Sequence, residues 1–197
     1  MTIAAITTMI VAAGIQTQFD QAATDRLHSV PVCVQSAIVA EETQARRLAS
    51  QMFLAAGVRL EWHRGLGQNT CPDGAIRITI TEHADRRLPH NALAYAMPYE
   101  GKHIQVFYDR IQRLAQGQRA PRLLAHVMVH EITHILQGVA RHSERGVMKA
   151  HWSGYDYALM ALRPLPFTDA DLVLIRTGLQ ARQAQMMVAM TARAPRF

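Results

Sequence analysis

Residues 127–138, VMVHEITHILQG, place two histidines and a glutamate in one apolar run of helical length. His130 and His134 are four positions apart and therefore lie one above the other on one face of a helix. Two imidazoles in this arrangement can bind a single tetrahedral Zn²⁺, and the carboxylate of Glu131 can then reach a water molecule on that ion. Chance produces the pattern roughly 0.02 times in a chain of this composition. The run therefore predicts a zinc-binding helix with Glu131 as general base.

A hydrolytic zinc site needs a third protein ligand and an open position for water. Gly138 ends the predicted helix and His142 follows in the next loop, so we expect His142 to be the third ligand. Three other side chains compete for this role: His126, His151 and Asp156. A ligand glutamate from a later helix is strongly disfavoured, because the only glutamate after His134 is Glu144, ten residues further along the chain.

The stretch HEITHILQGVARH (130–142) resembles the extended zinc motif HExxHxxGxxH of the metzincin metallopeptidases. Gly138 comes one residue later than the glycine of that motif, at whose position this chain has Gln137. His142 comes two residues later than the last histidine of the motif, at whose position this chain has Ala140. The following SERGVM (143–148) resembles the stretch that leads into the metzincin methionine turn. The resemblance implies a zinc endopeptidase with Met148 beneath the metal.

The rest of the pattern predicts the elements around this helix. Alternating apolar residues predict five strands: 30–34, 58–62, 75–81, 92–97 and 104–108. An apolar stripe of helical spacing from Ala45 to Ala56, closed by Gly57, predicts a helix between the first two strands, which should therefore be parallel. Pro121 suits the first position of the histidine helix. Residues 168–171, TDAD, form a capping box that begins a later helix.

We therefore expect an α+β, metzincin-like fold with a five-stranded mixed sheet, two long helices and a helical C-terminal subdomain. The order of these elements also matches the upper subdomain of the metzincins. That resemblance implies that a peptide substrate lies extended and antiparallel along the short edge strand 92–97.

The N-terminus and the cysteines favour export. Residues 3–13 form an apolar run that is too short to span a bilayer, and Val11-Ala12-Ala13 at its end suit the small-residue pattern of signal cleavage. No basic residue precedes the run, which leaves a cytoplasmic protein as the alternative. We expect residues 1–27 to be a signal peptide and leader, and residues 28–197 to form one catalytic domain, secreted or periplasmic. Cys33 and Cys71 should then pair.

Composition narrows the possible partners. The formal net charge is +6, but the basic residues are scattered and form no block with interleaved aromatic residues, so we expect no nucleic-acid partner. We also expect no membrane partner, a monomer, and a peptide or protein substrate. The prediction is a zinc-dependent endopeptidase. The alternatives are a weak or inactive zinc-binding protein of the same fold, an aspartate-ligated zinc peptidase, and a nucleic-acid-associated protein with an accidental histidine pair.

Overall fold

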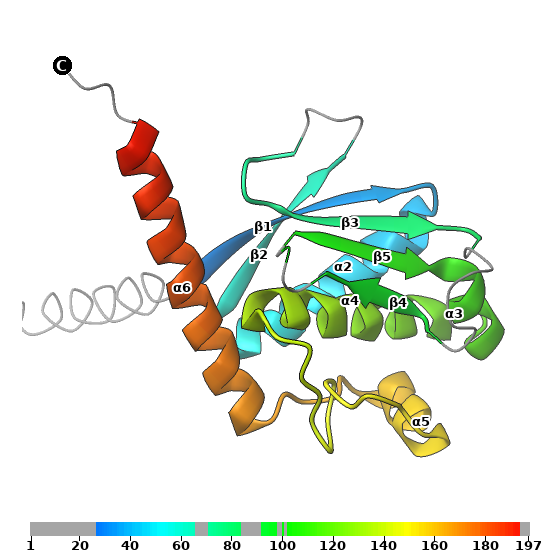
Figure 1. Ribbon diagram of the computed structural model, residues 1–197. Coiled ribbons are helices and arrows are strands. Elements are labelled where there is room, and N and C mark those ends of the chain that lie inside the picture. The colour runs from blue at the N-terminus through cyan, green and yellow to red at the C-terminus, as the bar shows by residue number, and fades with distance from the viewer. Residues whose placement is uncertain (1–26, 66–70, 84–91, 98–99, 101, 194–197) are drawn as a thin grey trace, which may run out of the picture.

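The computed structural model describes residues 27–65, 71–83, 92–97, 100 and 102–193 of the 197-residue chain. Its strands are β1 (His28–Ser36), β2 (Val58–Arg64), β3 (Ile76–Thr81), β4 (Ala94–Ala96) and β5 (His103–Phe107). They form one sheet in the order β2-β1-β3-β5-β4 (Figure 1). β1 pairs in parallel with β2 and with β3, β3 pairs in parallel with β5, and β4 is antiparallel to β5. The predicted five-stranded mixed sheet is confirmed, and so is the position of the fourth strand at its edge.

The described residues contain five helices: α2 (Val39–Ala55), α3 (Tyr108–Leu114), α4 (Arg119–Gln137), α5 (Gly154–Leu162) and α6 (Asp169–Arg193). Helix α2 connects the parallel strands β1 and β2, as the apolar stripe predicted. It ends where Gly57 adopts a left-handed φ of 77°. Helices α2 and α4 have 17 and 19 residues, and the longest helix, α6, has 25 residues and begins at the capping box predicted for the C-terminal part of the chain.

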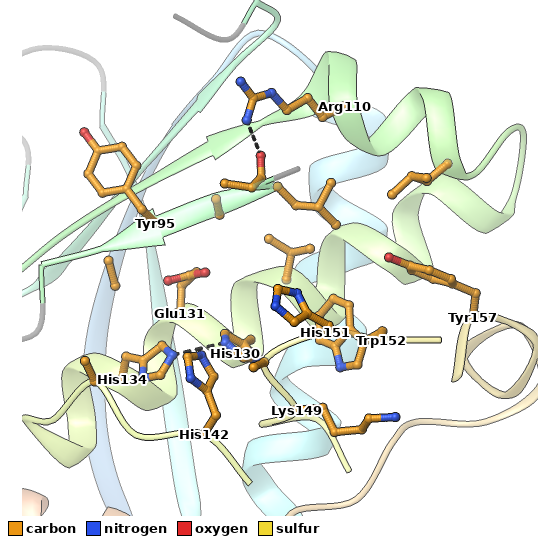
Figure 2. A pocket seen from close by; sticks show the side chains of 18 of the residues that line it. Tyr95, Arg110, His130, Glu131, His134, His142, Lys149, His151, Trp152 and Tyr157 are labelled. Atoms are coloured by element: carbon orange, nitrogen blue, oxygen red, sulfur yellow. Dashed lines mark hydrogen bonds between the residues drawn. The ribbon is translucent and has the colours of Figure 1, made fainter. Parts of the chain in front are cut away.

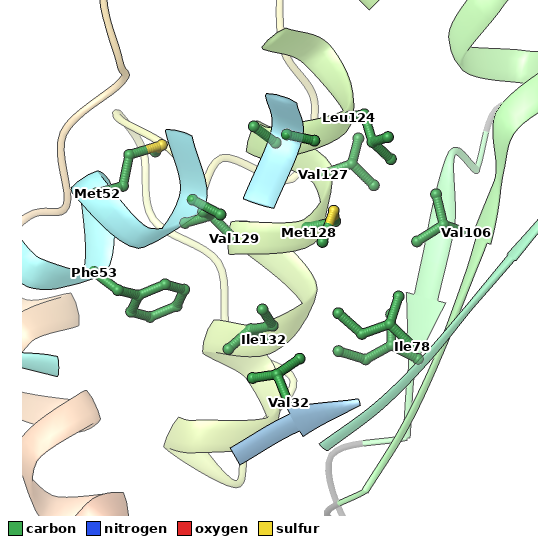
Figure 3. Close-up of a cluster of buried hydrophobic side chains, with 14 of the residues drawn as sticks. Val32, Met52, Phe53, Ile78, Val106, Leu124, Val127, Met128, Val129 and Ile132 are labelled. Atoms are coloured by element: carbon green, nitrogen blue, oxygen red, sulfur yellow. The ribbon is translucent and has the colours of Figure 1, made fainter. Parts of the chain in front are cut away.

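The hydrophobic core lies between the sheet and the helices α2 and α4 (Figure 3). Phe53 of α2 and Ile132 of α4 are fully buried there, together with Ile78 of β3. Along β3, buried residues alternate with half-buried ones, as expected for a strand that packs one face against helices. Each such aliphatic side chain stabilises the fold by about 1.5–3 kcal/mol relative to an exposed one. The core thus fixes α4 firmly against the sheet.

Two local predictions are wrong. The sequence pattern places Tyr108 in the fifth strand, but Tyr108 is the first residue of α3, a short helix that this pattern does not predict. No turn residue separates the strand from this helix, so nothing in the sequence marks the point where the strand ends and the helix begins. Pro121 is the third residue of α4 and not the first. Proline is tolerated there because the first four N–H groups of a helix have no intrahelical partner.

The C-terminal helix α6 packs against the end of α4. Thr168 and Asp171 form the predicted capping box: the Thr168 N–H and hydroxyl donate to Asp171, and the Asp171 N–H donates to Thr168. A Cβ atom at Gly178 would lie 1.7 Å from the carbonyl oxygen of Leu136. Glycine is therefore required where the two helices cross. No helix in the described part of the chain is long and apolar enough to cross a bilayer.

A disulfide links Cys33 of β1 to Cys71, which lies before β3. The Cα atoms are 5.7 Å apart, within the usual range for such a bond. The pairing expected for an exported chain is therefore present, and it ties together two neighbouring strands. The predicted signal peptide and leader lie outside the described residues, apart from residue 27.

Candidate metal centre

Helix α4 separates the core from a cleft. Apart from its first residue and the half-buried Arg122, every residue of α4 is buried. Met128, Val129 and Ile132 point into the core (Figure 3), whereas His130, Glu131 and His134 line the cleft (Figure 2). The rigid packing of the apolar face therefore sets the positions of the polar side chains on the other face.

His142 joins this pair from the following loop. The helix ends at Gly138, whose φ of 68° is left-handed and lets the chain reverse. The ligand nitrogens of His130, His134 and His142 all lie within 4.8 Å of one another (Figure 2). Three nitrogens on one tetrahedral zinc ion are about 3.3 Å apart. The cluster is thus somewhat wider than a closed zinc site, and His142 is its exposed member.

The hydrogen bonds of the two helix histidines suit a metal ion. Nδ1 of His130 donates to the carbonyl of Val147 at 2.9 Å, and Nδ1 of His134 donates to the carbonyl of Val139 at 3.2 Å. A carbonyl only accepts, so the proton of each neutral ring is on Nδ1 and the lone pair is on Nε2. These two Nε2 atoms lie 3.1 Å apart. Two lone pairs facing each other are stabilised by a cation between them, so the residues fit a zinc ion.

The histidines are poor proton acceptors in this environment. Burial, above all, lowers the pKa of His130 to about 4, and the positive charges of His134 and His142 add to this effect. Burial also lowers the pKa of His134. Neutral imidazole is the form that binds metals.

Glu131 lies between the histidines and the edge strand β4 (Figure 2). Its carboxyl is buried, and burial raises its pKa to about 8, although a hydrogen bond from the backbone of Ala96 acts in the opposite direction. The carboxyl therefore lies in the cleft, between the three histidines and the edge strand.

The cleft has a volume of about 670 Å³ and extends beyond the histidines. Its walls come from β4, α3, α4 and the segment before α5. Trp152 contributes one wall and stands edge-on to His130, with 5.6 Å between the ring centroids. Arg110 and Lys149 also line it. A role for Arg110 and Lys149 in the cleft wall was not predicted from the sequence, because it depends on the packing of distant segments.

His126 is excluded as a ligand by its contacts. It is fully buried, its Nδ1 donates to the carbonyl of Arg122 at 2.7 Å, and its Nε2 accepts from the N–H of Leu165 at 3.1 Å. Both nitrogens are used within the fold, so this histidine connects α4 to the segment before α6.

Asp156 also has another role. Its carboxylate accepts from Lys149 Nζ at 2.5 Å and from the N–H and hydroxyl of Ser153, and so completes a capping box at the start of α5. It is not part of the histidine cluster. His151 lines the cleft near His142, whose pKa is lowered by partial burial and by the charge of His151. Neither residue is among the three that converge.

Met148 is fully buried directly after Val147, whose carbonyl accepts from His130. The backbone of this segment is fixed at two points: Ser143 N–H donates to the Met148 carbonyl at 2.7 Å, and Val147 N–H donates to the Pro166 carbonyl at 2.9 Å. The stretch that resembles a methionine turn therefore contacts helix α4 through Val147.

Comparisons with known proteins bear on the fold. No protein-family model matches the chain, and no curated protein matches it in sequence. Among solved structures, archaemetzincin from Methanopyrus kandleri is similar, with a TM-score of 0.54 and 13% identity over 79% of this chain and 97% of that chain. The chain has an archaemetzincin-like fold. At this identity the likeness concerns the fold alone, and the α+β class predicted from the sequence is confirmed.

Proposed function

We propose that this protein is a zinc-dependent endopeptidase that hydrolyses peptide bonds in the cleft beside α4. One observation carries the proposal: three histidine side chains and the buried carboxyl of Glu131 converge in a cleft bordered by the edge of a sheet. The archaemetzincin-like fold supports it. Histidine nitrogens with an open fourth position are the ligand set of hydrolytic zinc.

Each residue has a distinct role in this proposal. His130, His134 and His142 hold the ion, and the carbonyls of Val147 and Val139 orient the first two rings. A bound zinc ion would lower the pKa of water, polarise the scissile carbonyl and favour the ionised form of Glu131. Glu131 then takes a proton from the attacking water and passes it to the leaving amine, a transfer suited to its central position.

The disulfide supports the proposal that the protein works in an oxidising compartment, since such bonds persist mainly in exported proteins. We infer a secreted or periplasmic peptidase that acts on peptide or protein substrates as a monomer.

Metal analysis of the purified protein, combined with cleavage of a peptide library, tests the function directly. We expect one zinc per chain and internal cleavage of peptides, both lost after treatment with a chelator and restored by zinc. A protein with stoichiometric zinc and no cleavage would instead be a metal-binding protein of this fold. A protein without metal affinity would contradict the proposal altogether.

A further inference from the structure

A single buried carboxylate connects the loop that carries His142 to the start of α6. The side chain of Asp171 is completely inaccessible to solvent. Its Oδ1 accepts from the hydroxyl of Ser143 at 2.6 Å and pairs with Nη1 of Arg141 at 3.3 Å. Its Oδ2 accepts from the N–H and hydroxyl of Thr168. Ser143 and Arg141 are the residues on either side of His142.

These contacts concern the least supported of the three histidines. The rings of His130 and His134 are each oriented by a backbone carbonyl. In the part of the chain that the structure describes, the ring of His142 has no such hydrogen bond, and the residue is exposed. Its position therefore depends on how firmly its neighbours are held.

The network around Asp171 holds them firmly. Arg141 Nη1 also donates to the hydroxyl of Ser143 at 3.3 Å, so the two neighbours of His142 contact each other as well as the carboxylate. The charge of Arg141 and the four contacts to Asp171 compensate for burying a carboxylate. These contacts tie both neighbours of His142 to the start of α6.

We propose that Asp171 is a positioning residue that sets the zinc affinity of the site by fixing His142 through Ser143 and Arg141. This inference rests on the proposed function, because it assumes that His142 is a ligand. A loop that is already ordered loses little entropy when the metal binds. Outer-shell partners of metal ligands typically contribute 10–100-fold to metal affinity.

The two sides of the carboxylate provide a matched pair of variants. Ser143→Ala removes the hydroxyl contact on the ligand side, whereas Thr168→Ala removes the hydroxyl contact on the helix side and keeps the one from the Thr168 N–H. We expect Ser143→Ala to weaken zinc binding by about 10-fold or more, and Ser143→Thr, which keeps the hydroxyl, to retain the affinity. Thr168→Ala should lower the unfolding midpoint as the loss of a helix cap, with zinc affinity changed by less than about two-fold.

Zinc dissociation constants are measured by competition with a chromophoric chelator, and unfolding midpoints by denaturant titration of the apoprotein. Co²⁺ absorption gives an independent readout, since a site with a loosened third histidine should lose the intensity of tetrahedral coordination. Asp171→Asn, which removes the charge, should weaken zinc binding at least as much as Ser143→Ala. If this variant does not fold, the Ser143 and Thr168 pair decides alone.

The failure of this inference differs from the failure of the proposed function. If wild-type protein binds zinc and His142→Ala weakens binding, but Ser143→Ala and Thr168→Ala both leave the affinity unchanged, then only the positioning role is overturned. Equal weakening by both variants would show a general effect of stability and would overturn it too. A wild-type protein without zinc affinity would overturn both proposals.

Discussion

Nδ1 of His130 donates a hydrogen bond to the carbonyl of Val147, 17 positions further along the chain, at 2.9 Å. This bond fixes the ring so that Nε2 faces the cleft, and it joins helix α4 to the segment that contains Met148. Ligand histidines commonly have such a partner, which sets their tautomer and orientation. The loop between α4 and α5 thus supports the centre twice, through Val147 and through His142.

The first prediction concerns the third ligand. His142→Ala should weaken zinc binding by more than about 100-fold, because removal of a ligand costs more than removal of an outer-shell partner. His151→Ala and Asp156→Asn should leave the metal content unchanged, since neither side chain belongs to the cluster. Metal content after dialysis and competition titrations check all three variants. Loss of zinc in Asp156→Asn with retention in His142→Ala would identify an aspartate-ligated site instead.

The sequence predicted the histidine cluster and the sheet because both depend on local patterns. The spacing of His130 and His134 is a property of the helix itself, and the alternation in β3 follows from burial of one face. The Thr168–Asp171 capping box was also visible. What could not be predicted is where that box lies: its carboxylate reaches Ser143, 28 positions earlier, only because α6 packs against α4.

Backbone groups were missed for a related reason. The carbonyl of Val147 and the N–H of Ala96 belong to residues whose side chains carry no polar signal. Helix α3 was missed because Tyr108 follows β5 directly, without a turn residue between them. Tertiary contacts determine these features, and a single sequence does not display them.

The second prediction concerns the disulfide. Replacement of Cys33 and Cys71 by serine should lower the free energy of unfolding by about 2–4 kcal/mol, since the bond closes a long loop in the unfolded chain. Urea denaturation with and without a reductant measures this effect. Reductant should destabilise the wild type and leave the double variant unchanged. An unfolding midpoint of the wild type that does not respond to reductant would rule out a stabilising bond.

The third prediction is a pH dependence that arises from Asp156. Burial alone would raise the pKa of this carboxyl, but hydrogen bonds from Lys149 and Ser153 outweigh burial and hold the pKa below its ordinary value. A carboxylate whose pKa is lowered by folding contributes its full stabilisation at pH values above its unfolded-state pKa, which is about 3.9 for aspartate. That contribution is lost as the pH falls through the lower folded-state pKa.

Asp156→Asn should therefore be less stable than the wild type at pH 7, and the difference should shrink as the pH approaches 3. Denaturant titrations at several pH values measure the trend. Asp169→Asn is the control, because Asp169 is an exposed carboxylate in the first turn of α6. A difference between Asp156→Asn and the wild type that is constant with pH would contradict this role.

The fourth prediction separates catalysis from metal binding. Glu131→Gln keeps the size of the side chain but cannot take up the proton of water. We expect it to retain one zinc per chain and to lose about 10²–10⁴-fold in kcat, the usual contribution of a general base. Peptide hydrolysis and metal content are measured on the same preparation. Hydrolysis at the wild-type rate would refute the assigned mechanism.

The last prediction places the substrate along β4. In the antiparallel ladder with β5, Met97 N–H donates to the carbonyl of His103 and Phe107 N–H donates to the carbonyl of Leu93. Hydrogen-bonded pairs alternate along such a ladder, so Ala94 and Ala96 turn their backbone groups away from β5. The backbone of Ala96 already bonds to Glu131.

An extended peptide that pairs with this open edge would therefore pass directly beside Glu131 and the three histidines, which places a scissile bond at the metal. Ala94→Pro removes one outward N–H without removing a bond to β5, and proline is accepted at sheet edges. Loss of one such hydrogen bond, worth about 1 kcal/mol, should lower kcat/KM about five-fold with zinc affinity unchanged. Ala94→Ser, which keeps the N–H, is the control. A complex with a peptide-like inhibitor bound elsewhere, or an unaltered kcat/KM in Ala94→Pro, would show that the edge of β4 does not hold the substrate.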